Sequence, residues 1–159
     1  MSSFQRHMAV MLLALATLVG ALSSCSQGPS DKSLEGPLKD AASAVRTTIM
    51  AVDLRMKEHT TAAAGSTAAD DMLKQLDSAA NNVKSLSAPT QDEQKLRDDV
   101  LATFTTVSRA MIHARDALAA PQGGPEAGQT GSSNLAPVLD ELHDASNQLD
   151  ALMTKAGIQ

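Results

Sequence analysis

Apolar residues recur every three or four positions along four stretches of the chain, and polar segments separate these stretches. This spacing is typical of amphipathic helices that bury one face. The pattern predicts helices over about 34–59, 68–87, 90–119 and 135–156. The residues predicted to point inward include Leu34, Leu38, Val45, Val52, Leu76, Val83, Phe104, Val107, Met111, Leu142, Leu149 and Leu152.

Residues with known positional preferences mark where three of these helices begin. Thr90 is followed three positions later by Glu93, which is the S/T-x-x-E form of a capping box, so a helix is predicted to start at Thr90. Pro37 suits the first turn of the first helix, because the missing N–H of proline costs nothing there. Asn134 is the predicted N-cap of the last helix.

Small, polar and helix-breaking residues mark the connections. Residues 60–67 (TTAAAGST) contain Gly65 and are predicted to form a loop. The pair Ala88–Pro89 ends the second helix, since a residue before proline disfavours helical backbone. Residues 121–133 are rich in Gly and Pro and are predicted to form a longer, mobile loop.

The four predicted helices indicate an all-α fold, because strand-forming runs are sparse. A helix with one apolar stripe must bury it against another helix, which favours an antiparallel four-helix bundle. Similar residues occupy matching positions in alternate helices, including Asn81 with Asn147. We interpret the chain as two tandem helical hairpins, 34–88 and 90–156, although shared periodicity alone also produces such matches.

A different pattern occupies the first 25 residues. Arg6 and His7 precede an apolar run of 15 residues, 8–22, which is followed by small residues. A basic start, an apolar middle and a small-residue exit are typical of an export signal. The run is shorter than the roughly 20 residues that a membrane-spanning helix needs, so we expect cleavage instead of a permanent transmembrane anchor.

Leu22-Ser23-Ser24-Cys25 resembles the lipobox of bacterial lipoproteins, in which an aliphatic residue and two small residues precede a cysteine. The resemblance implies cleavage between Ser24 and Cys25, attachment of acyl chains such as palmitate to Cys25, and a signal peptide over 1–24. Residues 25–33 would then form a flexible tether. The protein would be exported and anchored to the outer face of a plasma membrane or to an outer membrane. An ordinary secretory signal with an unrelated cysteine is the alternative.

Composition narrows the classes of partner. The whole chain carries 13 Lys and Arg against 18 Asp and Glu, and losing Arg6 with the signal peptide leaves a formal charge of −6. Such a charge opposes nucleic-acid binding. Phe104 is the only aromatic residue after the signal, which disfavours ligands that stack on aromatic faces.

Residues that carry catalytic or metal chemistry are few. None of His59, His113 and His143 has a Glu at the upstream helical spacing of a metal site, so no metal site is predicted. The sequence shows no nucleophile motif and no phosphate-binding loop, so no enzymatic activity and no cofactor are expected. The alternative is a small-ligand or copper carrier, for which Met56, Met72 and Met111 at one end of the bundle would be the ligands.

Four apolar residues fall on the polar sides of their helices: Met50 and Leu54 in the first, and Leu101 and Ile112 in the third. Scattered exposed apolar residues are common and need no function. The alternative is that they form a docking surface for a partner protein. The sequence thus predicts a non-catalytic binding or structural module on a bacterial membrane, which engages another envelope protein.

Overall fold

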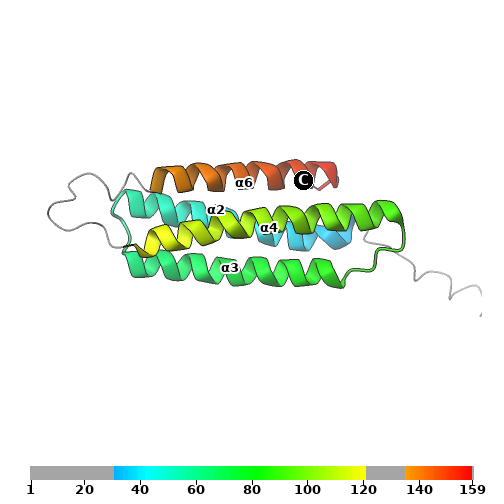
Figure 1. Ribbon diagram of the computed structural model, residues 1–159, viewed down its shortest axis with the longest axis horizontal. Coiled ribbons are helices and arrows are strands. Elements are labelled where there is room, and N and C mark those ends of the chain that lie inside the picture. Colours follow the sequence, from blue (N-terminus) through cyan, green and yellow to red (C-terminus); the bar gives the residue numbers. More distant parts are fainter. Residues whose placement is uncertain (1–30, 121–134, 159) are drawn as a thin grey trace, which may run out of the picture.

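The computed structural model describes residues 31–120 and 135–158, and within these ranges the chain forms helices and no strands. The helices are α2 (Asp31–Met56), α3 (Ala62–Ser85), α4 (Gln91–Ala119) and α6 (Leu135–Lys155). They run antiparallel in succession, side by side along one long axis (Figure 1). The predicted all-α four-helix bundle is therefore confirmed. The predicted signal peptide, Ser24, Cys25, the 121–133 loop and Asn134 lie outside the described residues.

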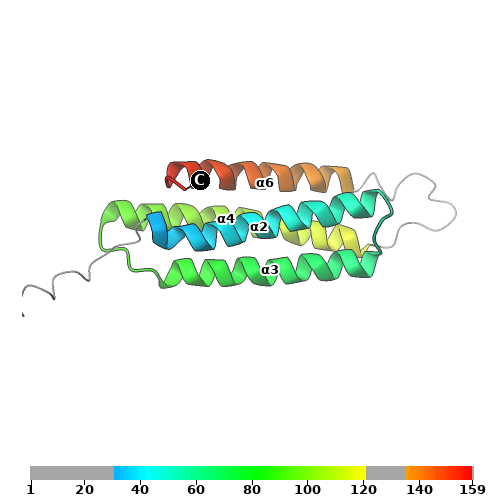
Figure 2. The same ribbon diagram turned by 180° about the vertical axis from the view of Figure 1, so that it is seen from behind.

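The helices are not equivalent in their surroundings. Both α2 and α4 pack against α3 and α6, and they also contact each other across the interior. α3 and α6 lie at opposite edges of the bundle in both views (Figures 1 and 2). Contact with three helices buries a wide arc of α2. This explains why Ala44, Thr48 and Ala51, outside the predicted stripe, are buried.

The predicted stripes form the core. All twelve inward-pointing residues named above from the sequence are buried. Phe104, the only Phe, Tyr or Trp among the described residues, is 2% exposed. Met56, Met72 and other residues predicted to point inward are partly buried and pack against this core. Thr48 is the one buried polar residue of the described chain, and its hydroxyl donates to the Ala44 carbonyl at 2.9 Å.

The first helix is longer at its start than predicted and shorter at its end. It begins at Asp31, so the predicted tether over 25–33 is wrong for its last three residues, 31–33. Leu34 is fully buried, and an ion pair of 2.6 Å joins Lys39 to Glu35 one turn away. Both interactions hold the early turns in helical form.

The predicted loop over 60–67 is also wrong, because α3 already begins at Ala62. Thr61 caps the helix, since its side chain accepts a hydrogen bond of 3.1 Å from the Ala64 N–H. Gly65 is buried, and a Cβ added there would lie 3.2 Å from Leu118 Cδ2. This glycine therefore permits close packing of α3 on α4 and does not mark a turn.

The predicted capping box is confirmed at the start of α4. The Glu93 N–H donates to Thr90 Oγ1 at 3.2 Å, and the Thr90 N–H donates to Glu93 Oε2 at 3.0 Å. Two backbone N–H groups that lack helical partners are thereby satisfied. Among the described helices, none is both long enough and apolar enough to cross a membrane.

Two helices end in the same hydrogen-bond pattern with different residues at the left-handed position. After α6, Gly157 has φ +71°, and the Ile158 N–H donates to the Met153 carbonyl at 2.9 Å. After α2, Glu58 has φ +58°, and the His59 N–H donates to the Leu54 carbonyl at 2.8 Å. Both are Schellman motifs, and the left-handed conformation strains any residue with a Cβ. Glu58 also explains why the helix predicted to reach His59 ends at Met56.

We expect Glu58→Gly to raise the free energy of unfolding by about 0.5–1 kcal/mol, because relief of the left-handed strain outweighs the added entropy of the unfolded chain. Gly157→Ala should lower it by a similar amount. The measurement is urea denaturation followed by circular dichroism at 222 nm, since the chain has no Trp or Tyr. Destabilisation by Glu58→Gly would show that the motif after α2 is not strained.

Candidate functional site

The structure separates the four apolar residues predicted to form a partner surface. Leu101 and Ile112 line a groove between α3 and α4, called here the α3–α4 groove. Met50 lines a second groove, between α2 and α6. Leu54 lines neither groove and is half-buried. Because α2 and α4 are diagonal partners in the bundle, these residues form two surfaces instead of one.

The α3–α4 groove has a volume of about 660 Å³ and follows one row of residues on each helix. The rows are Leu73, Asp77, Ala80 and Lys84 on α3, and Leu101, Thr105, Ser108, Ile112 and Arg115 on α4. Their spacings of three and four residues place each row on one helix face. The groove is therefore a direct result of two antiparallel helices lying side by side.

Apolar side chains form the floor of the α3–α4 groove. Leu76 and Phe104 lie at its base and belong to the buried core. Leu73 and Leu101 are partly buried and pack against that core. Ile112 is 38% exposed, and with Met50 it is one of the two exposed large hydrophobic residues of the described chain. Apolar surface thus continues from the core into the solvent at this groove.

The walls of the α3–α4 groove carry an unusual charge for this chain. Lys74, Lys84, Arg109 and Arg115 line it, with Asp77 as the one acidic residue. The chain as a whole has a formal charge of −5. The residues that line the groove therefore carry a net positive formal charge on a chain that is negative overall.

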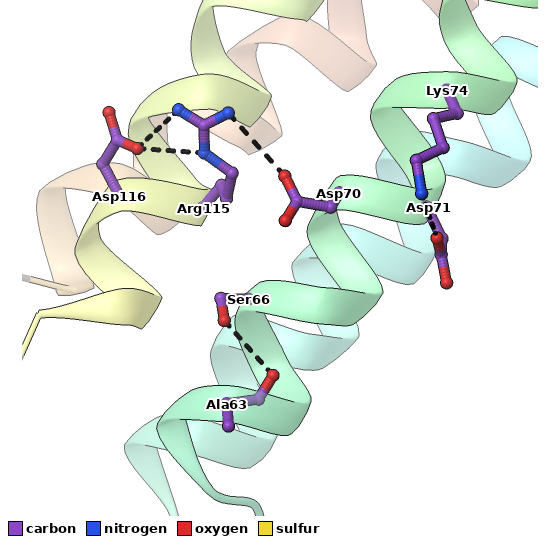
Figure 3. Close-up of polar contacts among 7 residues, drawn as sticks. All are labelled: Ala63, Ser66, Asp70, Asp71, Lys74, Arg115 and Asp116. Atoms are coloured by element: carbon purple, nitrogen blue, oxygen red, sulfur yellow. Dashed lines mark hydrogen bonds and ion pairs between the residues drawn. The ribbon is translucent and has the colours of Figure 1, made fainter.

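Two of these cations already have acidic neighbours at one end of the groove (Figure 3). Arg115 on α4 binds Asp116 at 2.7 Å and reaches Asp70 on α3 at 3.7 Å. Lys74 contacts Asp71 at 2.9 Å. The hydrogen bond and charge of Asp71 raise the pKa of Lys74, and Asp116 raises the pKa of Arg115 in the same way. Both groups stay charged, although their carboxylates partly neutralise them.

The other two cations of the groove are unpaired. Within residues 31–120 and 135–158, neither Lys84 nor Arg109 forms an ion pair or a side-chain hydrogen bond, and both are exposed. Lys95 on α4 is also exposed and without an ion pair among the described residues, but it does not line the groove. Lys84 and Arg109 are thus available to a partner, and Lys95 is a natural control.

The second groove differs in charge. It has a volume of about 540 Å³ and is lined by Met50, which is 56% exposed, and by Met153. Its cations are Lys39, which pairs with Glu35 at 2.6 Å, and Arg46, which lies 3.6 Å from Asp150. Because both cations have carboxylate partners, this groove offers less charge to a ligand than the α3–α4 groove.

The three histidines of the described residues, His59, His113 and His143, are exposed, and one makes a contact that helical spacing does not predict. His113 Nδ1 on α4 lies 2.9 Å from Glu141 Oε2 on α6. The contact joins two helices, so residue spacing within one helix does not reveal it. In the described part of the chain, no group of three or more His, Cys, Asp or Glu side chains is placed to hold a metal ion. Met111 is fully buried in the core.

Comparisons with protein-family models, with curated proteins and with solved structures find no match to this chain. A four-helix bundle by itself hosts many unrelated functions. The two features from which a function can be proposed are therefore the resemblance of residues 22–25 to a lipobox and the α3–α4 groove.

Proposed function

We propose that this is a lipid-anchored protein of a bacterial cell envelope, which binds another envelope protein through the α3–α4 groove without catalysing a reaction. The observation that carries the binding proposal is the groove itself. An acidic chain gathers four basic side chains around an apolar floor there and leaves Ile112 exposed. Apolar surface rimmed by polar groups is typical of an interaction site.

The resemblance of residues 22–25 to a lipobox supports the anchoring part of the proposal. Cys25 precedes the first residue of α2, Asp31, by only a few positions. The start of α2 lies toward the same end of the bundle as the α3–α4 connection (Figure 2). Acyl chains on Cys25 would hold that end near the membrane. The groove, which runs along α3 and α4, would then extend away from the lipid surface.

The test is photo-crosslinking in cells that make the full chain. A photo-crosslinking amino acid at Thr105, on the edge of the groove, is expected to form a discrete adduct with another protein. The same amino acid at Asn147, which is exposed on α6, is the positional control. Equal adduct patterns at the two positions, or no adduct at Thr105, would contradict binding through the groove.

A matched pair of substitutions sharpens this test. Ile112→Asp places a charge on the floor of the α3–α4 groove and is expected to abolish the Thr105 adduct. Met50→Asp makes the same chemical change in the α2–α6 groove and should leave the adduct unchanged. Both side chains are partly exposed, so circular dichroism should show unchanged helix content in each variant.

A further inference from the structure

We infer that the segment bound in the α3–α4 groove is an acidic amphipathic α-helix of the partner protein, which lies along the groove as a fifth helix. This inference rests on the proposed function and specifies the chemistry of the partner. It follows from three properties of the groove, namely its length, its exposure and its charge.

The length of the groove suits a short helix. Its walls extend from Leu73 to Lys84 on α3 and from Leu101 to Arg115 on α4. At 1.5 Å per residue, these rows are about 16 Å and about 21 Å long, which is three to four helical turns. A helix with apolar residues at i, i+3, i+4 and i+7 would place one stripe along such a row. Ala80 lies in the middle of the groove, where its small side chain leaves room.

The exposure of the groove distinguishes a helix from a lipid chain. Lys74, Asp77, Thr105 and Arg109 line the groove and are exposed, so the site is open along its length. An acyl chain bound there would keep much of its apolar surface in water, which is unfavourable. An amphipathic helix would cover the apolar floor with one face and keep its polar face in water. The open shape therefore favours the helix.

The charge of the groove specifies acidic residues on that helix. Four basic residues and one acidic residue line the groove on a chain whose formal charge is −5. Lys84 and Arg109 have no partner among the described residues, so carboxylates of a docked helix would meet them without displacing an existing ion pair. Complementary charge of this kind selects partners and speeds association.

The experiment maps the segment that crosslinks to Thr105 in the full chain. The adduct is isolated from cells, digested and sequenced by mass spectrometry. The expected result is a partner peptide with net negative charge and apolar residues at i, i+3 or i+4, and i+7. Lys84→Glu combined with Arg109→Glu should reduce the adduct by about tenfold, because two attractions become repulsions. Lys95→Glu, outside the groove, should leave the adduct within about twofold of the original.

The outcomes separate this inference from the proposed function. A crosslinked segment that is basic or extended would overturn the acidic helix while leaving protein binding through the groove intact. A Thr105 adduct that survives the double charge reversal would also overturn the acidic helix alone. A Thr105 adduct with a second copy of this chain only would overturn both, because the proposed function requires a different envelope protein. An adduct with phospholipid alone, or none at all, would overturn both the inference and the proposed function.

Discussion

Cys25→Ala is expected to move the protein from the membrane fraction to the soluble fraction of the cells that make it. The reason is the resemblance of residues 22–25 to a lipobox, in which the cysteine thiol accepts a diacylglycerol. Each buried CH₂ of an acyl chain contributes about 0.8 kcal/mol to membrane binding, so two or more chains give a stable anchor. Cys25 is the only cysteine of the chain, and no other thiol can replace it.

The measurement is cell fractionation together with metabolic labelling by a clickable palmitate analogue. The original protein should carry the label and sediment with membranes, whereas Cys25→Ala should lose both properties. Ser24→Ala is the matched control, because it keeps a small residue beside the cleavage point and should retain label and membrane association. Unlabelled, soluble protein in the original chain would instead favour an ordinary secretory signal with an unrelated cysteine.

The helices and their core could be predicted because both depend on local periodicity. Burial of one face imposes a 3.6-residue repeat, and residues such as Leu38, Val83, Met111 and Leu149 follow it. The capping box at Thr90 is likewise local, since its bonds join residues three positions apart. Interactions between residues that are one or two helical turns apart can be predicted from the sequence of one helix alone.

The predicted start of α3 is wrong because Gly65 suggests a loop, although Thr61 is a local N-cap signal for the earlier start. Gly65 beside Thr67 looks like loop sequence when only neighbouring residues are considered. In the fold, Gly65 faces Leu118 of α4, where a larger side chain would be crowded. A glycine can mark a turn or permit close packing of two helices, and for Gly65 only the position of α4 distinguishes the two.

The α3–α4 groove combines a predictable part with an unpredictable one. The sequence alone identifies Leu101 and Ile112 as apolar residues on the polar side of their helix. The cations are not evident from the sequence, because Lys84 and Arg109 belong to different helices and line one groove only through the antiparallel packing of α3 and α4. A partial signal existed, since Arg109, Ile112 and Arg115 are spaced by three residues on one helix. Only the order of the helices around the bundle shows that α3 lies beside this face of α4 and adds Lys74 and Lys84 to it.

Phe104→Ala is expected to lower the free energy of unfolding by about 3–5 kcal/mol. Phe104 is 2% exposed and is part of both the core and the floor of the α3–α4 groove. Removing its ring loses the transfer free energy of a large apolar group and leaves a cavity that the surrounding helices fill only in part. Small domains have total stabilities of about 5–15 kcal/mol, so this single change should remove a large share.

Thermal and urea denaturation at 222 nm would measure the effect, with an expected fall in the melting temperature of roughly 10–20 °C. Met50→Ala is the control, because Met50 is 56% exposed and its truncation should change stability by less than about 0.5 kcal/mol. Similar losses for the two variants would mean that the interior around Phe104 is not closely packed. A large loss at Phe104 alone would show that the groove floor is part of the folded core, so that the apolar surface offered to a partner is held rigid before binding.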